Sequence, residues 1–178
     1  MEIGRIMRRV VGTLFATALL ALGMTSCAAP EPVPADSEAP PPTSAPASPG
    51  AEAADALCAS GEGGGDACVI TAQTAAEDLS FAGYEVVKIV DSTLQGAVTV
   101  DGVGELVVTN TRFGADLTVT GVDGVVIKLS DVAGSLVLSD AEHAALVQNT
   151  VAGDLRCEGV SADGDGNRVT GTNTCPTR

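Results

Sequence analysis

The sequence is poor in aromatic and basic side chains. Its 178 residues include no tryptophan, one tyrosine, three phenylalanines and a single histidine, and nine Lys and Arg residues stand against 23 Asp and Glu residues. The resulting net charge of −14 excludes the basic surface that nucleic-acid binding requires. One histidine likewise excludes a histidine-rich metal centre. We therefore expect no nucleic-acid partner, and the length allows one modest domain.

Motifs that support common catalytic reactions are also missing. The sequence contains no Gly-x-Ser-x-Gly elbow and no glycine-rich loop of the phosphate-binding type. These absences argue against a serine hydrolase, a kinase or a dehydrogenase. We predict that the protein is not an enzyme and that it needs no cofactor.

Residues 1–26 have the pattern of a secretory signal peptide. A short basic start precedes an apolar run at residues 10–22, which is shorter than the roughly 20 residues of a membrane-spanning helix. The following residues, Met24-Thr25-Ser26-Cys27, resemble a bacterial lipobox with methionine in place of the usual leucine. That resemblance implies a diacylglycerol group on Cys27 and anchoring to the outer face of the bacterial cell membrane. The alternative is ordinary signal cleavage nearby, which would leave Cys27 unmodified.

Residues 27–50 are predicted to be a disordered tether. Eight of the nine prolines of the chain fall between Pro30 and Pro49, among small and acidic residues that cannot form a core. A polyproline-like conformation would extend this segment by about 3.1 Å per residue. Removal of the signal peptide would take away three arginines and one glutamate and leave a net charge of −16, so the lipid would have to supply the membrane affinity.

From Cys68 onward the chain repeats itself without insertions, with a fixed period of nineteen. Four columns of apolar residues recur at this spacing, and members of neighbouring columns lie two residues apart, which is the period of a strand. Small residues recur at two corner positions. A polar column is expected to form a ladder of side-chain hydrogen bonds at a bend, and it contains Gln73, Ser92, Thr111, Ser130 and Asn149. The apolar columns are Cys68, Val87, Leu106, Val125, Ala144; Ile70, Ile89, Val108, Ile127, Leu146; Leu79, Val98, Leu117, Leu136, Leu155; and Phe81, Val100, Val119, Leu138, Cys157.

This repeat predicts an all-β fold, a single-stranded parallel β-helix of about five coils over residues 67–160. Each repeat has an apolar face that is too small to be stable alone and that stacking on the next copy would bury. We expect right-handed winding, because the apolar spacing lacks the six-residue step of left-handed helices. The alternative is an antiparallel β-sandwich, which gives no reason for a fixed period.

Four cysteines are expected to close the two ends of the solenoid, with an N-terminal cap at residues 51–66 and a C-terminal cap at residues 161–178. In an exported protein they favour two disulfides. Cys58 lies shortly before Cys68, where the first coil begins, and Cys175 follows Cys157 by almost one coil. The predicted pairs are therefore Cys58–Cys68 and Cys157–Cys175. A zinc site is disfavoured because no Cys-x-x-Cys spacing is present.

The end of the chain carries a family resemblance. The segments 155–159 and 166–171, followed by Cys175, resemble the ending of uncharacterised secreted β-helix proteins and lipoproteins of high-GC Gram-positive bacteria. The resemblance covers about twenty residues together with the style of the repeat. It implies an exported solenoid and carries no activity with it.

Candidate ligand and catalytic residues are few. Asp163, Asp165 and Asn167 alternate like the first ligands of a calcium-binding EF-hand loop, but Arg168 occupies the position that requires glycine. The three residues are therefore weak calcium candidates, and a turn with solvated carboxylates is the alternative. His143 shares a turn column with Glu105 and Gly124, and we interpret it as a solvated corner residue.

These patterns lead to one functional expectation. We expect a cell-envelope lipoprotein that presents a rigid acidic β-helix as a non-catalytic module, with a cell-wall polymer or a protein as its partner. The alternatives are calcium-dependent adhesion, polysaccharide binding and a lyase-like enzyme. A lyase would need clustered carboxylates with calcium and a basic residue. Arg112 is instead expected to pair with Asp131 on the surface.

Overall fold

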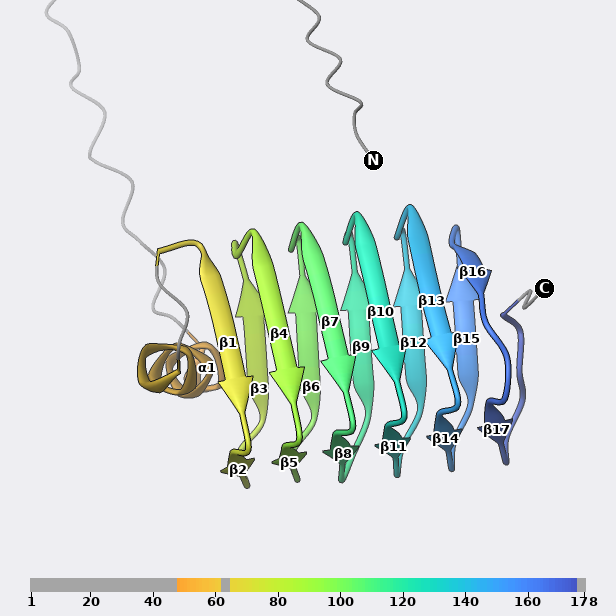
Figure 1. Ribbon diagram of the computed structural model, residues 1–178, viewed down its shortest axis with the longest axis horizontal. Coiled ribbons are helices and arrows are strands. Elements are labelled where there is room, and N and C mark those ends of the chain that lie inside the picture. The colour runs from red at the N-terminus through yellow and green to blue at the C-terminus, as the bar shows by residue number, and fades with distance from the viewer. Residues whose placement is uncertain (1–47, 62–64, 176–178) are drawn as a thin grey trace, which may run out of the picture. The chain divides into compact units, whose positions relative to one another are not determined.

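The computed structural model describes residues 48–61 and 65–175, which belong to the second of two compact units, Ser44–Arg178. The predicted signal peptide, Cys27 and most of the predicted tether lie outside the described residues. The described part contains one helix, α1 (Pro49–Ser60), followed by 17 short strands. Successive coils of the chain add their strands to three parallel sheets (Figure 1).

The three sheets run along the length of the solenoid. The first contains β1 (Ala67–Thr71), β4 (Val86–Val90), β7 (Glu105–Thr109), β10 (Gly124–Lys128), β13 (His143–Val147) and β16 (Ser161–Asp163). The second contains β2 (Thr74–Ala75), β5 (Thr93–Leu94), β8 (Arg112–Phe113), β11 (Asp131–Val132), β14 (Thr150–Val151) and β17 (Arg168–Val169). The third contains β3 (Leu79–Ala82), β6 (Val98–Asp101), β9 (Leu117–Thr120), β12 (Leu136–Ser139) and β15 (Leu155–Glu158).

The strand register confirms the predicted repeat. Every strand from β1 to β14 pairs in parallel with the strand one coil later, so that Val98 lies beside Leu117 and Leu117 beside Leu136. Figure 1 shows β4 and β7 running down at the front and β6 and β9 running up behind them as the coils advance to the right, which is right-handed winding. Parallel pairing excludes the antiparallel sandwich.

The core is a set of columns inside the coil. The large side chains of these columns have essentially no exposed surface, and two phenylalanines, Phe81 and Phe113, are among them at 0%. Phe113 lies between Leu94 and Val132 in the second sheet, as the repeat predicts. These two aromatic rings are used for packing and are not available for stacking on a sugar ring.

Two corners of the coil require the left-handed backbone conformation. One corner has glycine in four of its five coils, Gly83, Gly102, Gly121 and Gly159, all with φ between 59° and 74°. The other corner, between the first and second sheets, is left-handed without any glycine, at Ala72, Asp91, Asn110, Leu129 and Gln148. Sequence reasoning found the first corner from its glycines. The polar column placed a bend beside the second corner, but its positive φ was not predicted, because an L-residue in that conformation carries no compositional signal except at asparagine and aspartate.

The N-terminal end of the solenoid is covered by α1, which packs against β1 and β3 (Figure 1). Its buried face consists of Ala54 and Cys58, and the Cys58–Cys68 disulfide joins it to the first strand. The chain returns so closely to β1 at Gly61 that a Cβ atom there would collide with the carbonyl oxygen of Val69. The predicted N-terminal cap is therefore a helix held by a covalent bond.

The C-terminal end is closed by an extended strap formed by residues 171–175. The strap pairs with β15 through hydrogen bonds from the Leu155 N–H to the Thr172 carbonyl and from the Thr174 N–H to the Leu155 carbonyl. The predicted Cys157–Cys175 disulfide fastens it. Strands also continue beyond residue 160, the predicted end of the β-helix. The last coil is one residue shorter than the others, because Thr150 in β14 pairs with Arg168 in β17, at a separation of 18 residues instead of 19.

Candidate functional site

A ladder of buried polar side chains lines one inner corner of the solenoid. Its rungs are Ser92, Thr111, Ser130 and Asn149, all at most 3% exposed. Three of these side chains accept a hydrogen bond from a backbone N–H of the preceding coil. For example, the Asn149 Oδ1 accepts the Ser130 N–H at 3.0 Å. The Thr111 hydroxyl is the exception, because it donates to backbone carbonyls. Among the described residues no buried side-chain nitrogen or oxygen lacks a partner. This inner ladder provides hydrogen-bond partners for backbone groups at the bend, so its role is structural.

The weak calcium candidates do not gather around one point. The Asn167 Oδ1 accepts hydrogen bonds from the backbone N–H and from the Nδ2 of Asn149, both at 3.0 Å, and its Nδ2 donates to the Leu146 carbonyl. Asn167 is thus the last rung of the inner ladder. Asp163 lies in β16 beside Ala145, and the Asp165 carbonyl accepts the Gln148 N–H. Within residues 48–61 and 65–175 no three His, Cys, Asp or Glu side chains are placed to share a metal ion.

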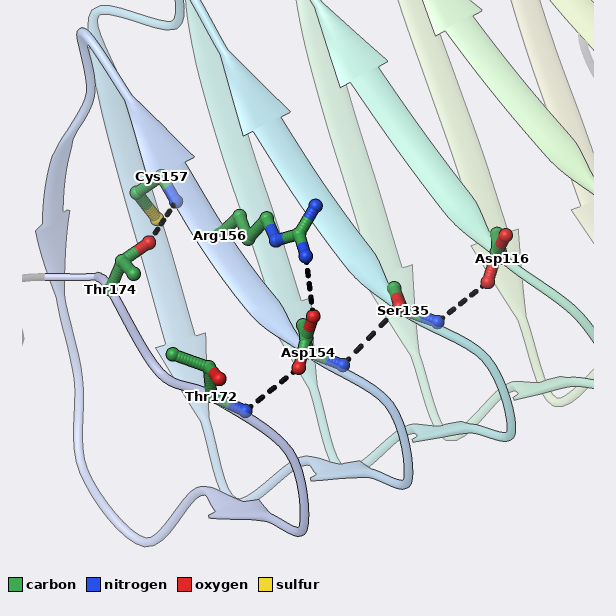
Figure 2. Close-up of polar contacts among 7 residues, drawn as sticks. All are labelled: Asp116, Ser135, Asp154, Arg156, Cys157, Thr172 and Thr174. Atoms are coloured by element: carbon green, nitrogen blue, oxygen red, sulfur yellow. Dashed lines mark hydrogen bonds and ion pairs between the residues drawn. The ribbon is translucent and has the colours of Figure 1, made fainter.

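A second ladder, the outer ladder, runs along the corner before the third sheet (Figure 2). The Asp116 Oδ1 accepts the Ser135 N–H at 2.7 Å, and the Ser135 Oγ accepts the Asp154 N–H at 3.2 Å. The Asp154 Oδ1 in turn accepts the Thr172 N–H at 2.8 Å and so holds the C-terminal strap. Each of these side chains therefore fastens the backbone of the next coil.

The pKa of Asp154 reflects this role. The hydrogen bond from the Thr172 N–H lowers the pKa of the carboxyl group below its usual range, and the nearby Arg156 guanidinium, 2.6 Å away, acts in the same direction. A carboxyl group whose pKa is depressed by folding stabilises the protein above its unfolded pKa, and the contribution disappears as the pH falls through the folded pKa. Acidification should therefore loosen the strap.

Ala97 interrupts the outer ladder. The Asp78 Oδ1 accepts the Ala97 N–H at 2.8 Å, but the methyl group of Ala97 offers no acceptor to the next coil at Asp116. We predict that Ala97→Ser raises the free energy of unfolding by about 0.5 to 1 kcal/mol, because its hydroxyl can accept the Asp116 N–H. Urea unfolding measures the change. The matched control is Ala133→Ser at an exposed corner, and equal effects of the two substitutions would contradict the prediction.

The remaining polar residues lie on the surface or are half-buried. Arg112 and Asp131 form the predicted ion pair at 3.6 Å, with side chains 70% and 57% exposed, so the pair contributes little to stability. Tyr84 is half-buried next to α1, and its hydroxyl donates to Asp55 at 2.6 Å. Burial, together with this acceptor, raises the pKa of Tyr84 to about 12.

The first sheet carries a groove on its outer face, at the end where β7, β10 and β13 begin. Its floor includes the outward side chains of Val126 and Ala145, which are half-buried. Its rim is acidic, and it includes His143. The groove has a volume of about 480 Å³ and is lined by Gly104, Glu105, Asp123, Gly124, Val125, Val126, Glu142, His143, Ala144, Ala145 and Asp163.

The groove exists because one column lacks a side chain. Gly124 pairs with Glu105 on one side and with His143 on the other, so a notch replaces the side chain that adjacent coils carry. Sequence reasoning placed His143, Glu105 and Gly124 in one column but did not infer a groove. The available signal was a glycine at the position where the neighbouring repeats carry Glu105 and His143.

No helix among the described residues is long and apolar enough to cross a membrane. Cys27, the predicted lipidation site, lies outside the described residues. Comparisons of the chain with protein-family models, with curated proteins and with solved structures found no match.

Proposed function

We propose that the protein is a lipoprotein of the bacterial cell envelope whose rigid acidic β-helix is a non-catalytic interaction module outside the cytoplasm. The observation that carries the proposal is the pair of disulfides, Cys58–Cys68 and Cys157–Cys175, one at each end of the solenoid. Disulfides persist in oxidising compartments and are rare in the cytosol. Both bonds close structural caps, which favours a permanent structural role for them.

The membrane anchor in this proposal is Cys27, for which the lipobox-like residues 24–27 and the apolar run before them are the support. An anchor of this kind is needed because the protein is strongly acidic and anionic lipid headgroups would repel it. Two acyl chains contribute about 0.8 kcal/mol for each buried methylene group, which is enough for stable attachment. The proline-rich segment would then separate the β-helix from the membrane surface.

The interaction role is supported by the build of the solenoid. Its interior is filled by side chains, its ends are capped, and its outer surface consists of three sheets with regularly spaced residues. Solenoids with such surfaces bind partners along their length without an enclosed pocket. The exposed Arg112 is paired with Asp131, which leaves it poorly suited to act as a catalytic base.

Lipidation of Cys27 is tested by mass spectrometry of the full-length chain expressed in a Gram-positive host. We expect the wild-type protein in the membrane fraction with a diacylglycerol group on Cys27, and Cys27→Ser released into the medium. The matched control is Met24→Leu, which restores the usual lipobox residue and should leave the protein in the membrane. Wild-type protein that is found in the medium with an unmodified Cys27 would overturn the anchor.

A further inference from the structure

The groove at Gly124 is open to an incoming side chain. A Cβ atom added to Gly124 would meet only the Cγ of Glu105, at 3.9 Å, which is an ordinary van der Waals contact. The groove is a shallow, open depression of about 480 Å³, so an occupant would lie along the sheet and would not be enclosed. The notch is therefore real space on the sheet, and the backbone at this position does not require glycine, because its φ is not positive.

The groove combines an apolar floor with an acidic rim. Val126 and Ala145 point outward from β10 and β13 and are only half-buried. Around them stand four exposed carboxylates, contributed by Glu105, Asp123, Glu142 and Asp163. A bare cation would gain nothing from the floor, whereas an alkyl chain that ends in a positive charge would use both parts.

The carboxylates of the rim have no cationic partner of their own within the described residues. In that part of the chain the ion pairs are Arg112–Asp131 and Arg156–Asp154, neither of which lies in the groove. Lys88 and Lys128 lie on the same sheet and form no ion pair with the described rim residues. Adjacent coils are about 4.8 Å apart, and like charges on neighbouring strands destabilise each other. A cationic occupant would remove this repulsion.

We propose that this groove binds a basic segment of a partner protein, with a Lys or Arg side chain in the notch at Gly124 and an apolar neighbour on Val126 and Ala145. The inference rests on the proposed interaction role and adds the chemistry of its partner. Charge complementarity selects the occupant, since the surrounding protein carries a net charge of −14 and would steer a basic segment toward the rim.

The test is a binding titration with the full-length chain in mild detergent at low salt. The probe is a fluorescein-labelled peptide of about ten residues that repeats Lys-Ser-Val-Ser, so that Lys and Val lie on the same face of an extended segment. We expect saturable binding that weakens as salt is added. We expect Gly124→Val to weaken binding by about tenfold by filling the notch. Its melting temperature should not fall, because valine favours strands.

Charge-matched variants separate the groove from the general acidity of the protein. The groove pair is Asp123→Asn with Glu142→Gln, and the control pair is Asp101→Asn with Glu158→Gln on the third sheet; all four residues are exposed. Each pair removes two negative charges. The groove pair should weaken binding by about tenfold and the control pair by less than about threefold. Equal weakening by both pairs, or full binding by Gly124→Val, would overturn the inference.

Three other outcomes also decide the matter. If about 1 mM calcium raises the melting temperature of the wild type by several degrees and Gly124→Val abolishes the rise, the groove is a metal site and the inference is overturned. If no peptide binds although Cys27 carries lipid, the groove inference fails and the anchor stands. If the peptide binds in the groove but Cys27 is unmodified, the anchor fails and the groove inference stands.

Discussion

Removal of both disulfides is expected to lower the free energy of unfolding by about 6 kcal/mol, the largest effect we predict for this protein. The two bonds span 10 and 18 residues, and closing loops of this length contributes about 3 kcal/mol each. The bonds lie at opposite ends of the solenoid, so their effects should add. Because domains of this size are stable by about 5 to 15 kcal/mol, the reduced protein should be marginal.

Urea unfolding of alanine variants measures the effect of each bond. Cys58→Ala with Cys68→Ala should free α1 from the first coil, and Cys157→Ala with Cys175→Ala should free the strap from β15. Alanine is preferred to serine because Cys68 is fully buried, with 0% exposed. The control is reductant, which should destabilise the wild type and leave the variant without all four cysteines unchanged. An unfolding midpoint unaffected by loss of either bond would contradict the prediction.

This prediction bears on where the protein works. A chain that loses about 6 kcal/mol on reduction would be poorly folded in the cytosol and fully stable after export. The proposed location outside the cytoplasm and the stability of the β-helix therefore depend on the same four cysteines. Each bond joins a cap to the coil beside it.

The columns of the repeat explain how far sequence reasoning could go. A fixed period without insertions sets which residues stack, so Val98, Leu117 and Leu136 could be assigned to one side of the core from the sequence alone. The disulfide pairing followed from the same register. Features within the repeat were predictable because every coil reports the same environment, which gives several independent observations of each position.

The features that escaped prediction lie where the repeat changes. The final coil is one residue shorter than the others, so Asn167 does not fall in the polar column by counting and was assigned to a calcium-like loop instead. The helix α1 begins at Pro49, inside the segment predicted as tether. It was not predicted, because its buried apolar face is limited to Ala54 and Cys58. The groove at Gly124 arises because one repeat lacks a side chain, and a feature that occurs in a single repeat produces no periodic pattern in the sequence.

Asn149→Ala is expected to lower the free energy of unfolding by about 3 to 5 kcal/mol. The expected cause is the loss of buried hydrogen bonds and not the loss of apolar packing. The Asn149 side chain is 2% exposed and makes three hydrogen bonds. Without it the Ser130 N–H loses its side-chain acceptor, and the Ile127 carbonyl loses its donor at 2.8 Å. Unpaired groups in a buried corner cost about 1 to 3 kcal/mol each.

Two companion substitutions show whether the inner ladder is the cause. Thr150→Ala changes the next residue, which is exposed and outside the ladder, and should alter stability by less than about 0.5 kcal/mol. Asn149→Ser keeps an oxygen for the Ser130 N–H, as Ser130 itself does for the Thr111 N–H at 3.2 Å, but its single hydroxyl cannot donate to two acceptors. Its loss should be intermediate. Thermal and urea unfolding that ranked Asn149→Ala no lower than Thr150→Ala would show that water replaces the missing bonds and that the polar column is not a stabilising ladder.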